Sequence, residues 1–141
     1  MGVAGAGKST VGTLLANALG VSYLEGDDLH PADNVRRMAQ GIPLSDDDRR
    51  GWLTAIAERI TQAHRTGTGL VIACSALKRA YRDVLRGADP DLQLVFLTGD
   101  AALLARRLSQ RGGAIFSRRR CWRPRSCRHA SNTTIPPISM R

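Results

Sequence analysis

Apolar and polar residues alternate along positions 1–113 in two rhythms, one typical of amphipathic helices and one typical of buried strands. The helical rhythm predicts helices over residues 10–19, 31–41, 45–67, 78–86 and 101–111. Short apolar runs between them predict strands over residues 21–24, 70–74 and 92–97. Strands and helices therefore follow one another in turn. This order predicts an α/β fold, a three-layer sandwich around a mostly parallel sheet, with ligands at the carboxyl ends of the strands.

Residues with terminal preferences mark where these helices begin and end. Gly20 and Gly67 suit the left-handed conformation that closes a helix. Ser45 precedes three aspartates, which is typical of a helix N-terminus: the hydroxyl can accept a free N–H, and acids favour the positive end of the helix dipole.

The first residues contain the pattern G-x-x-x-x-G-K-[ST], which is the phosphate-binding P-loop. Its glycines let backbone N–H groups turn toward a polyphosphate, Lys8 reaches the β- and γ-phosphates, and Ser9 offers a hydroxyl to Mg²⁺. A glycine-rich turn between a strand and a helix is the alternative, and the Gly-Lys-Ser ending argues against it. The predicted nucleotide site consists of Gly2, Val3, Ala4, Gly5, Ala6, Gly7, Lys8, Ser9 and Thr10. We therefore expect the chain to bind a nucleoside triphosphate.

A P-loop normally follows a buried strand, and here only Met1 precedes Gly2. We therefore expect the first strand of the sheet to be lacking. Either Met1 is an internal methionine of a longer protein, or the fold is damaged.

Charge is distributed unevenly along the chain. Residues 1–113 carry 14 Lys and Arg against 12 Asp and Glu, whereas residues 114–141 carry seven Arg and no acid. The net charge of +9 therefore belongs mainly to the tail, and a nucleic-acid partner is not expected for the body. With Trp122 among its arginines, the tail fits a basic nucleic-acid arm, a disordered extension or, as we favour, a GC-rich gene translated out of frame. The chain is thus divided into a body, residues 1–113, and a tail, residues 114–141.

The three cysteines, Cys74, Cys121 and Cys127, have neither the number for a disulfide framework nor the spacing of a zinc site. The sequence has no signal peptide and no long apolar span, so we expect a cytoplasmic protein without a membrane partner.

Beyond the P-loop, an ordered series of short segments extends the pattern over roughly residues 1–113. These segments are Gly26–Pro31, Gly41–Leu44, Asp46–Arg49, Trp52-Leu53, Cys74–Lys78, Tyr81–Asp83 and Phe96-Leu97, followed by Arg107, Leu108 and Arg111. The series resembles that of bacterial-type gluconate kinases, which are P-loop small-molecule kinases of the shikimate-kinase-like branch. The resemblance implies a P-loop NTPase-type fold and transfer of the γ-phosphate of ATP, with Mg²⁺, to the 6-hydroxyl of D-gluconate. It is also compatible with a homodimer.

Phosphoryl transfer needs a clamp on the phosphates, a metal, a group near the attacking hydroxyl, and cations for the developing charge. Asp27 follows the second strand of the expected sheet, where such a fold presents its ligand. There it could accept the hydroxyl proton, orient the alcohol or reach Mg²⁺ through water; the alternative is a turn formed with Asp28. Catalytic roles are predicted for Lys8, Asp27 and Arg111.

Gluconate combines a carboxylate with several hydroxyls, so its site needs a cation and hydrogen-bonding groups. The predicted substrate-binding residues are Asp27, His30, Arg49, Ser75, Lys78 and Arg82. The alternatives are that each cation is a solvated helix residue and that His30 caps the helix starting at Pro31. Arg107 and Arg111 end a helix where this family begins a mobile lid, and they are predicted to meet the ATP phosphates. The alternative for both arginines is that they lie in solvent at the C-terminal end of a helix.

After Gly113 the resemblance to gluconate kinases ends. The lid body, the last strand and its helix are lacking, so with the first strand two core strands are lost. The net stability of a folded domain is only about 5–15 kcal/mol, so the loss of two core strands is expected to be severe. A catalytically dead ATP-binding fragment is therefore one alternative. Others are a kinase acting on shikimate or a nucleoside monophosphate, and a nucleic-acid-binding protein working through residues 118–128.

Overall fold

The computed structural model describes residues 1–110, so the predicted Arg111 and the basic tail lie outside the described part of the chain. The elements are α1 (Lys8–Leu19), β1 (Ser22–Glu25), the 3-10 helix η1 (Gly26–Leu29), α2 (Ala32–Ala39), α3 (Asp46–Thr66), β2 (Leu70–Ala73), α4 (Arg79–Ala88) and α5 (Ala101–Gln110). The α/β class and the five predicted helices are confirmed, with bounds that move by one or two residues.

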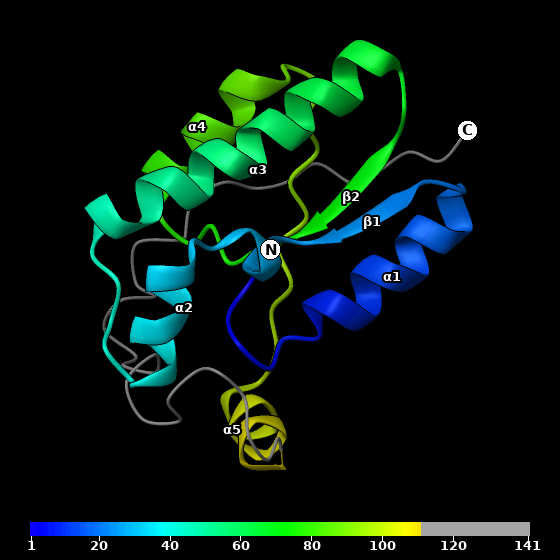
Figure 1. Cartoon of the computed structure of the whole chain (residues 1–141). Coiled ribbons are helices and arrows are strands. Elements are labelled where there is room, and N and C mark those ends of the chain that lie inside the picture. Colours follow the sequence, from blue (N-terminus) through cyan, green and yellow to red (C-terminus); the bar gives the residue numbers. More distant parts are fainter. Residues whose placement is uncertain (111–141) are drawn as a thin grey trace.

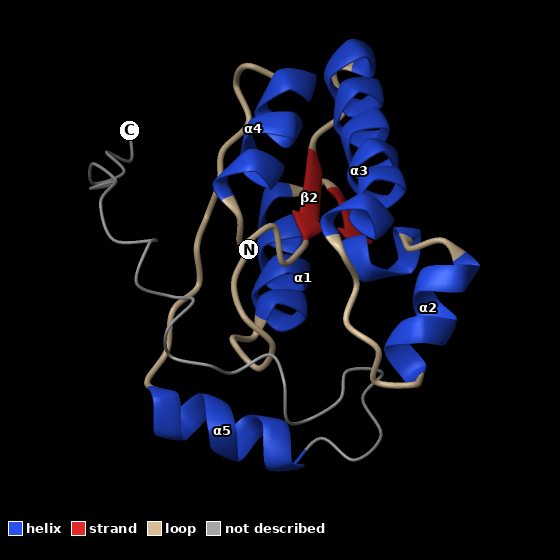
Figure 2. Cartoon of the chain, turned by 90° about the vertical axis from the view of Figure 1, so that its left-hand side faces the viewer, coloured by secondary structure: helices blue, strands red, loops and turns tan. Residues whose placement is uncertain are grey.

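The sheet and its covering helices form three layers. β1 and β2 pair in parallel, with Ser22 opposite Leu70 and Glu25 opposite Ala73. α1 contacts both strands from one face, and α3 and α4, which pack against each other, lie on the opposite face (Figure 1). A view turned by 90° shows α5 set apart below these layers (Figure 2). The core on the α3–α4 side consists of Trp52, Leu53, Ile56, Ile60, Cys74, Ala76, Tyr81 and Leu85.

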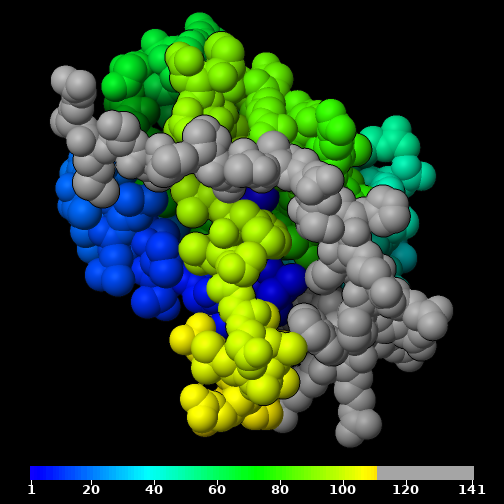
Figure 3. Space-filling model, turned by 180° about the vertical axis from the view of Figure 1, so that it is seen from behind, coloured from blue at the N-terminus to red at the C-terminus, as the bar shows by residue number. Residues whose placement is uncertain are grey.

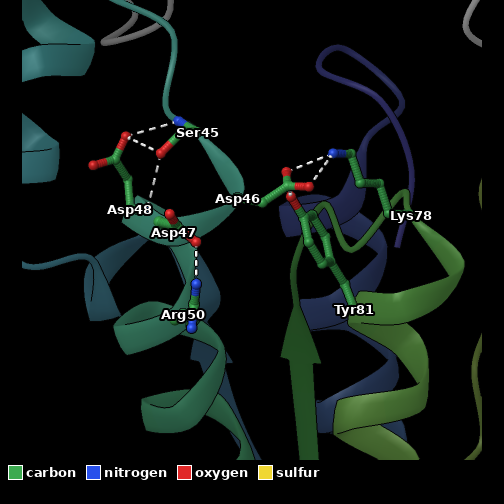
Figure 4. Close-up of polar contacts among 7 residues, drawn as sticks. All are labelled: Ser45, Asp46, Asp47, Asp48, Arg50, Lys78 and Tyr81. Atoms are coloured by element: carbon green, nitrogen blue, oxygen red, sulfur yellow. Dashed lines mark hydrogen bonds and ion pairs between the residues drawn. The ribbon is translucent and has the colours of Figure 1, made fainter.

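The predicted helix ends are confirmed in their geometry. Gly20 and Gly67 close α1 and α3 in the left-handed conformation, with φ of 66° and 64°. At the start of α3, the Ser45 hydroxyl accepts from the N–H of Asp48, while the Asp48 carboxylate accepts from the N–H of Ser45 at 2.7 Å (Figure 4). This capping box satisfies two N–H groups that the helix itself leaves free.

The predicted strand over residues 92–97 is wrong as a regular strand, and the reason is its partner. Of this segment, Val95 and Leu97 pair with the backbone of Met1: the Met1 ammonium donates to the Val95 carbonyl at 2.6 Å, and the Leu97 N–H donates to the Met1 carbonyl at 2.8 Å. Figure 3 shows this segment, in yellow-green, running down the back of the molecule with N-terminal residues, in blue, beside it. A single paired residue does not make a strand, because a strand is defined by a ladder of such bonds.

Candidate functional site

The phosphate loop has the backbone conformation that its glycines permit. Gly2, Gly5 and Gly7 have φ of 147°, 82° and 88°, values that side-chain-bearing residues rarely adopt. A Cβ on Gly2 would lie 2.6 Å from the Leu97 carbonyl oxygen, and one on Gly5 would lie 3.2 Å from the Leu108 side chain. Conformation therefore favours glycine at all three positions, and space favours it at Gly2 and Gly5 as well.

The loop leads directly into α1. Gly7 precedes the helix, whose first residue is Lys8. The Gly7 carbonyl accepts the N–H of Val11 at 2.9 Å. The Lys8 ammonium turns back to donate to the Val3 carbonyl at 3.2 Å. Ser9 and Thr10 are exposed in the first turn. The loop thus presents an ammonium, a hydroxyl and the positive end of a helix to one region, which is the arrangement that binds phosphates.

α5 approaches the loop from the other side. A Cβ on Gly5 would lie 3.3 Å from the Leu104 carbonyl oxygen, and one on Gly7 would lie 4.0 Å from a guanidinium nitrogen of Arg107. Arg107 is exposed, but it reaches the phosphate loop rather than only ending a helix. The structure therefore brings Arg107 to Gly7, the residue before Lys8, whereas Arg111 lies outside the described residues.

The ends of β1 and β2 meet closely, which sets the position of Asp27. A Cβ on Gly26 would lie 2.7 Å from the Ala73 carbonyl oxygen and 2.9 Å from the Cβ of Cys74. Asp27 follows immediately, in η1, and its carbonyl accepts the N–H of His30 at 3.3 Å. Asp27 therefore belongs to a turn and also lies at the carboxyl edge of the sheet, and its functional role stays a prediction.

Asp27 keeps access to solvent, although surrounding protein atoms crowd its carboxyl group. This crowding, followed by the nearby Glu25 carboxylate, raises the pKa of Asp27 above its ordinary value. The charges of Lys8 and Arg49 act in the opposite direction. Asp27 is thus electrostatically coupled to the phosphate loop and to Arg49, and its carboxylate is more basic than that of an ordinary aspartate.

His30 lies buried beneath this turn. Its ring stacks on Trp52 with centroids 4.6 Å apart and an interplanar angle of 9°. Burial, followed by the charge of Arg49, lowers the pKa of His30 to about 4, so the ring is neutral at physiological pH. Its Nδ1 atom has no hydrogen-bond partner among the described residues. α2 has no side-chain cap, so the capping alternative for His30 is wrong.

The predicted cations divide into two groups. Arg49 is half-buried and forms no ion pair with an acid of residues 1–110, as is also true of Arg82. The Arg82 guanidinium instead donates to the Leu77 carbonyl at 2.6 Å, across the loop that contains Ser75. The Lys78 ammonium donates to the Asp46 carboxylate. Arg49 therefore remains the cation most free to meet an anionic ligand.

Lys78 forms a bridge between two helix starts. Its ammonium donates to both carboxylate oxygens of Asp46, at 2.5 and 2.6 Å, and the Tyr81 hydroxyl donates to the same carboxylate at 2.6 Å (Figure 4). These contacts join the first turn of α3 to the first turn of α4. The structure therefore gives Lys78 a partner in Asp46, whose carboxylate also lies within the electrostatic reach of Arg49.

Two residues of this region are not among the predicted site residues. Trp52 donates its indole N–H to the Gly26 carbonyl at 2.6 Å and supports His30 from below. Glu25 raises the pKa of Asp27 and accepts from the Tyr23 hydroxyl at 2.7 Å. The sequence places Trp52 in a helix and in the series of family segments, and nothing in either pattern indicates its partner 26 positions earlier.

Residues 1–110 contain no cluster of three or more His, Cys, Asp or Glu side chains able to hold a metal ion. None of the helices in this part of the chain is long and apolar enough to cross a bilayer. Cys74 is a free, buried thiol.

A glycine loop leading into a helix, beside parallel strands covered on both faces, defines a P-loop kinase fold. A family model described as shikimate kinase matches residues 4–124. The thermoresistant gluconokinase of Escherichia coli is 45% identical over 116 residues, which are 82% of this chain and 66% of that protein. A probable gluconokinase of Xenopus tropicalis is 41% identical over 84% of this chain and 70% of that protein.

Among solved structures, a gluconokinase from Sinorhizobium meliloti 1021 has a TM-score of 0.73 at 49% identity, covering 84% of this chain and 66% of that one. The chain belongs to the shikimate kinase family of P-loop kinases, in its gluconokinase group. It spans 60–66% of the length of several curated gluconokinases that it matches.

Proposed function

We propose that this chain carries the phosphoryl-transfer site of a gluconokinase, which transfers the γ-phosphate of ATP to the 6-hydroxyl of D-gluconate. The observation that supports the proposal most directly is the position of Asp27, at the edge of the sheet and coupled to both Lys8 and Arg49. The family relationship supports ATP as donor and D-gluconate as acceptor.

The residues of the phosphate loop fit a triphosphate. The close approaches at Gly2 and Gly5 leave room only for a bare backbone, and the left-handed glycines turn the loop around the start of α1. Lys8, at the start of α1, and Arg107, whose guanidinium lies near Gly7, supply positive charge beside the loop. Mg²⁺ would be held by the Ser9 hydroxyl together with phosphate oxygens, where it would neutralise charge on the transferred group.

Asp27 is proposed to act on the attacking hydroxyl. Its raised pKa makes it a better proton acceptor than an ordinary aspartate, and its carboxylate oxygen takes the hydroxyl proton. Arg49, half-buried and without an ion pair among the described residues, is proposed to bind the gluconate carboxylate. His30, neutral and held flat against Trp52, and Ser75, beyond β2, are proposed to contact the polyol hydroxyls.

Arg82 and Lys78 are proposed to have supporting roles. Arg82 ties the loop between β2 and α4, so it positions Ser75. Lys78 would reach an acceptor only by releasing Asp46. The predicted homodimer and the role of Arg111 remain predictions.

The test is ADP release by the whole chain with ATP and Mg²⁺, comparing D-gluconate, shikimate and a nucleoside monophosphate as acceptors. We expect turnover with D-gluconate. Asp27→Asn should lower kcat by about 10²–10⁴-fold while nucleotide affinity is retained. Asp28→Asn, at the neighbouring exposed acid, is the matched control and should leave the rate nearly unchanged. Because Asp27 must be ionised, kcat should rise with pH through a pKa above the ordinary 3.8.

Each result separates the proposal from its alternatives. Turnover with shikimate but not with D-gluconate would assign a different acceptor. ATP binding that is lost in Lys8→Ala, with no turnover on any acceptor, would identify a nucleotide-binding domain without transferase activity. Equal rates for Asp27→Asn and Asp28→Asn would remove Asp27 from the mechanism.

A further inference from the structure

We propose that Tyr23 is a positioning residue for the Ser9 hydroxyl. The phenol oxygen accepts the hydroxyl proton of Ser9, and this bond turns the lone pairs of Ser9 toward the space where a nucleotide-bound Mg²⁺ would lie. The inference rests on the role of Ser9 as a magnesium ligand in the proposed function. It adds to that role a residue that acts on the ion only through Ser9.

Tyr23 extends from β1 toward α1. Successive side chains of a strand point to opposite faces, so Tyr23 and Glu25 lie on the same face of β1. The Tyr23 hydroxyl donates to the Glu25 carboxylate at 2.7 Å. A Cβ on Gly12 of α1 would lie 2.7 Å from Cε2 of the Tyr23 ring. The phenol is therefore held between the end of β1 and the surface of α1, and Gly12 provides the room for its ring.

Ser9 lies within reach of this phenol. Ser9 and Gly12 are three positions apart in α1, so they share a face of the helix, and a ring that packs on Gly12 also lies beside Ser9. Burial, followed by the bond to Glu25, raises the pKa of Tyr23 to about 12, and a hydrogen bond with the Ser9 side chain acts in the opposite direction. The phenol is therefore neutral at physiological pH and keeps its proton.

The direction of these two bonds follows from the number of protons. A neutral phenol has one proton, and Tyr23 donates it to Glu25. Toward Ser9, Tyr23 can then only accept, so the Ser9 hydroxyl donates. A hydroxyl binds a metal ion through an oxygen lone pair, so its proton must point elsewhere. The chain from Ser9 through Tyr23 to Glu25 fixes that proton on the protein side and leaves the lone pairs of Ser9 for the ion.

The experiment measures how strongly Mg²⁺ improves ATP binding by the whole chain. Calorimetric titration gives the dissociation constant of ATP in EDTA and in Mg²⁺, and the ratio of the first to the second is the magnesium effect. We expect Tyr23→Phe, which keeps the ring, to lower the magnesium effect by about 2–10-fold, the range of one hydrogen bond. The constant in EDTA should stay the same, whereas a merely structural role would weaken ATP binding in both conditions.

Tyr81→Phe is the matched control. Its hydroxyl also donates to a carboxylate, that of Asp46 at 2.6 Å, but Tyr81 lies in α4, on the other face of the sheet from α1. Tyr81→Phe should therefore leave the magnesium effect unchanged. An equal loss in Tyr23→Phe and Tyr81→Phe would overturn the proposal, because the loss would then not depend on nearness to Ser9.

A double-mutant cycle shows whether Tyr23 acts through Ser9. Ser9→Ala should lower the magnesium effect, and Tyr23→Phe should have no further effect in the Ser9→Ala chain. Additive losses would overturn the proposal. An unchanged magnesium effect in Ser9→Ala would overturn both this inference and the magnesium site of the proposed function. A loss in Ser9→Ala with none in Tyr23→Phe would overturn this inference alone.

Gly12→Ala keeps the proposal testable if Tyr23→Phe does not fold. The added Cβ displaces the edge of the Tyr23 ring but retains the phenol hydroxyl. We expect it to lower the magnesium effect in the chain with Ser9 and not in the Ser9→Ala chain. A loss of the same size in both chains, or none in either, would overturn the proposal. So would a magnesium effect that rises in Tyr23→Phe or Gly12→Ala, because the phenol would then be withholding Glu25 from the ion.

Discussion

The phosphate loop and the acceptor side of the site lie at the same edge of the sheet, but they are held by different kinds of interaction. The loop depends on backbone: three left-handed glycines and two close approaches to carbonyl oxygens. The acceptor side depends on side chains from a distant helix, because Trp52 supports both the Gly26 carbonyl and the His30 ring. A local motif can therefore specify the first region, whereas the second exists only once α3 has packed.

The largest effect on stability is expected at Trp52, where the acceptor side is supported. Trp52→Ala removes a fully buried ring, its hydrogen bond to Gly26 and its stack with His30, and should lower the free energy of unfolding by about 3–5 kcal/mol. Trp52→Phe keeps the stack and loses the donor, at a cost of about 1–3 kcal/mol. Urea denaturation followed by circular dichroism measures both.

Leu14→Ala, at an exposed position of α1, is the control and should change the free energy of unfolding by less than about 0.5 kcal/mol. If Trp52→Ala resembled this control, the side-chain support of the acceptor side would be disproved. The contrast between a phosphate loop held by backbone and an acceptor side held by side chains would then no longer stand.

These two regions also show how far the sequence alone leads. The phosphate loop, the cap at Ser45 and the closing glycines of α1 and α3 are predicted correctly, because each depends on residues a few positions apart. The strand over residues 92–97 is not, because a strand needs a neighbour to pair with, and only Met1 pairs with this segment among the described residues.

Side-chain partners across the fold were equally hard to foresee. The sequence offers Lys78 as a free cation near a strand end, and the structure gives it to Asp46, 32 positions earlier. Arg49, another cation predicted to bind the acceptor, stays half-buried without an ion pair in residues 1–110. Composition and spacing do not distinguish these two cations, because the difference lies in the packing of α3 against α4.

An intermediate effect is expected at Gly2, where the phosphate loop depends on backbone. In Gly2→Ala the added Cβ would meet the Leu97 carbonyl oxygen at 2.6 Å in a conformation with φ of 147°. The free energy of unfolding should fall by about 1–3 kcal/mol, and ATP affinity should fall with it, because the loop must move. Calorimetric titration with ATP and urea denaturation measure the two effects.

Gly20→Ala is the matched control for the phosphate loop. Gly20 also has a left-handed backbone, with φ of 66°, but open space surrounds its Cβ position. It should cost about 1 kcal/mol and leave ATP affinity unchanged. Equal effects of the two substitutions would mean that the contact with Leu97 imposes nothing on the loop.

The smallest effect is expected at the bridge between α3 and α4. Lys78 and Tyr81 donate to Asp46, and these bonds lower the pKa of Asp46 below its ordinary value of 3.8. A lowered folded-state pKa stabilises the protein above pH 3.8, and this contribution is lost as the pH falls through the folded-state pKa. Asp46→Asn should therefore lower Tm slightly at pH 7 and flatten its decline below pH 4.

The bridge is exposed, so 1 M salt should weaken its contribution. Asp47→Asn removes a first-turn charge without touching Lys78, and an equal change in that variant would show that the helix dipole, and not the bridge, is responsible.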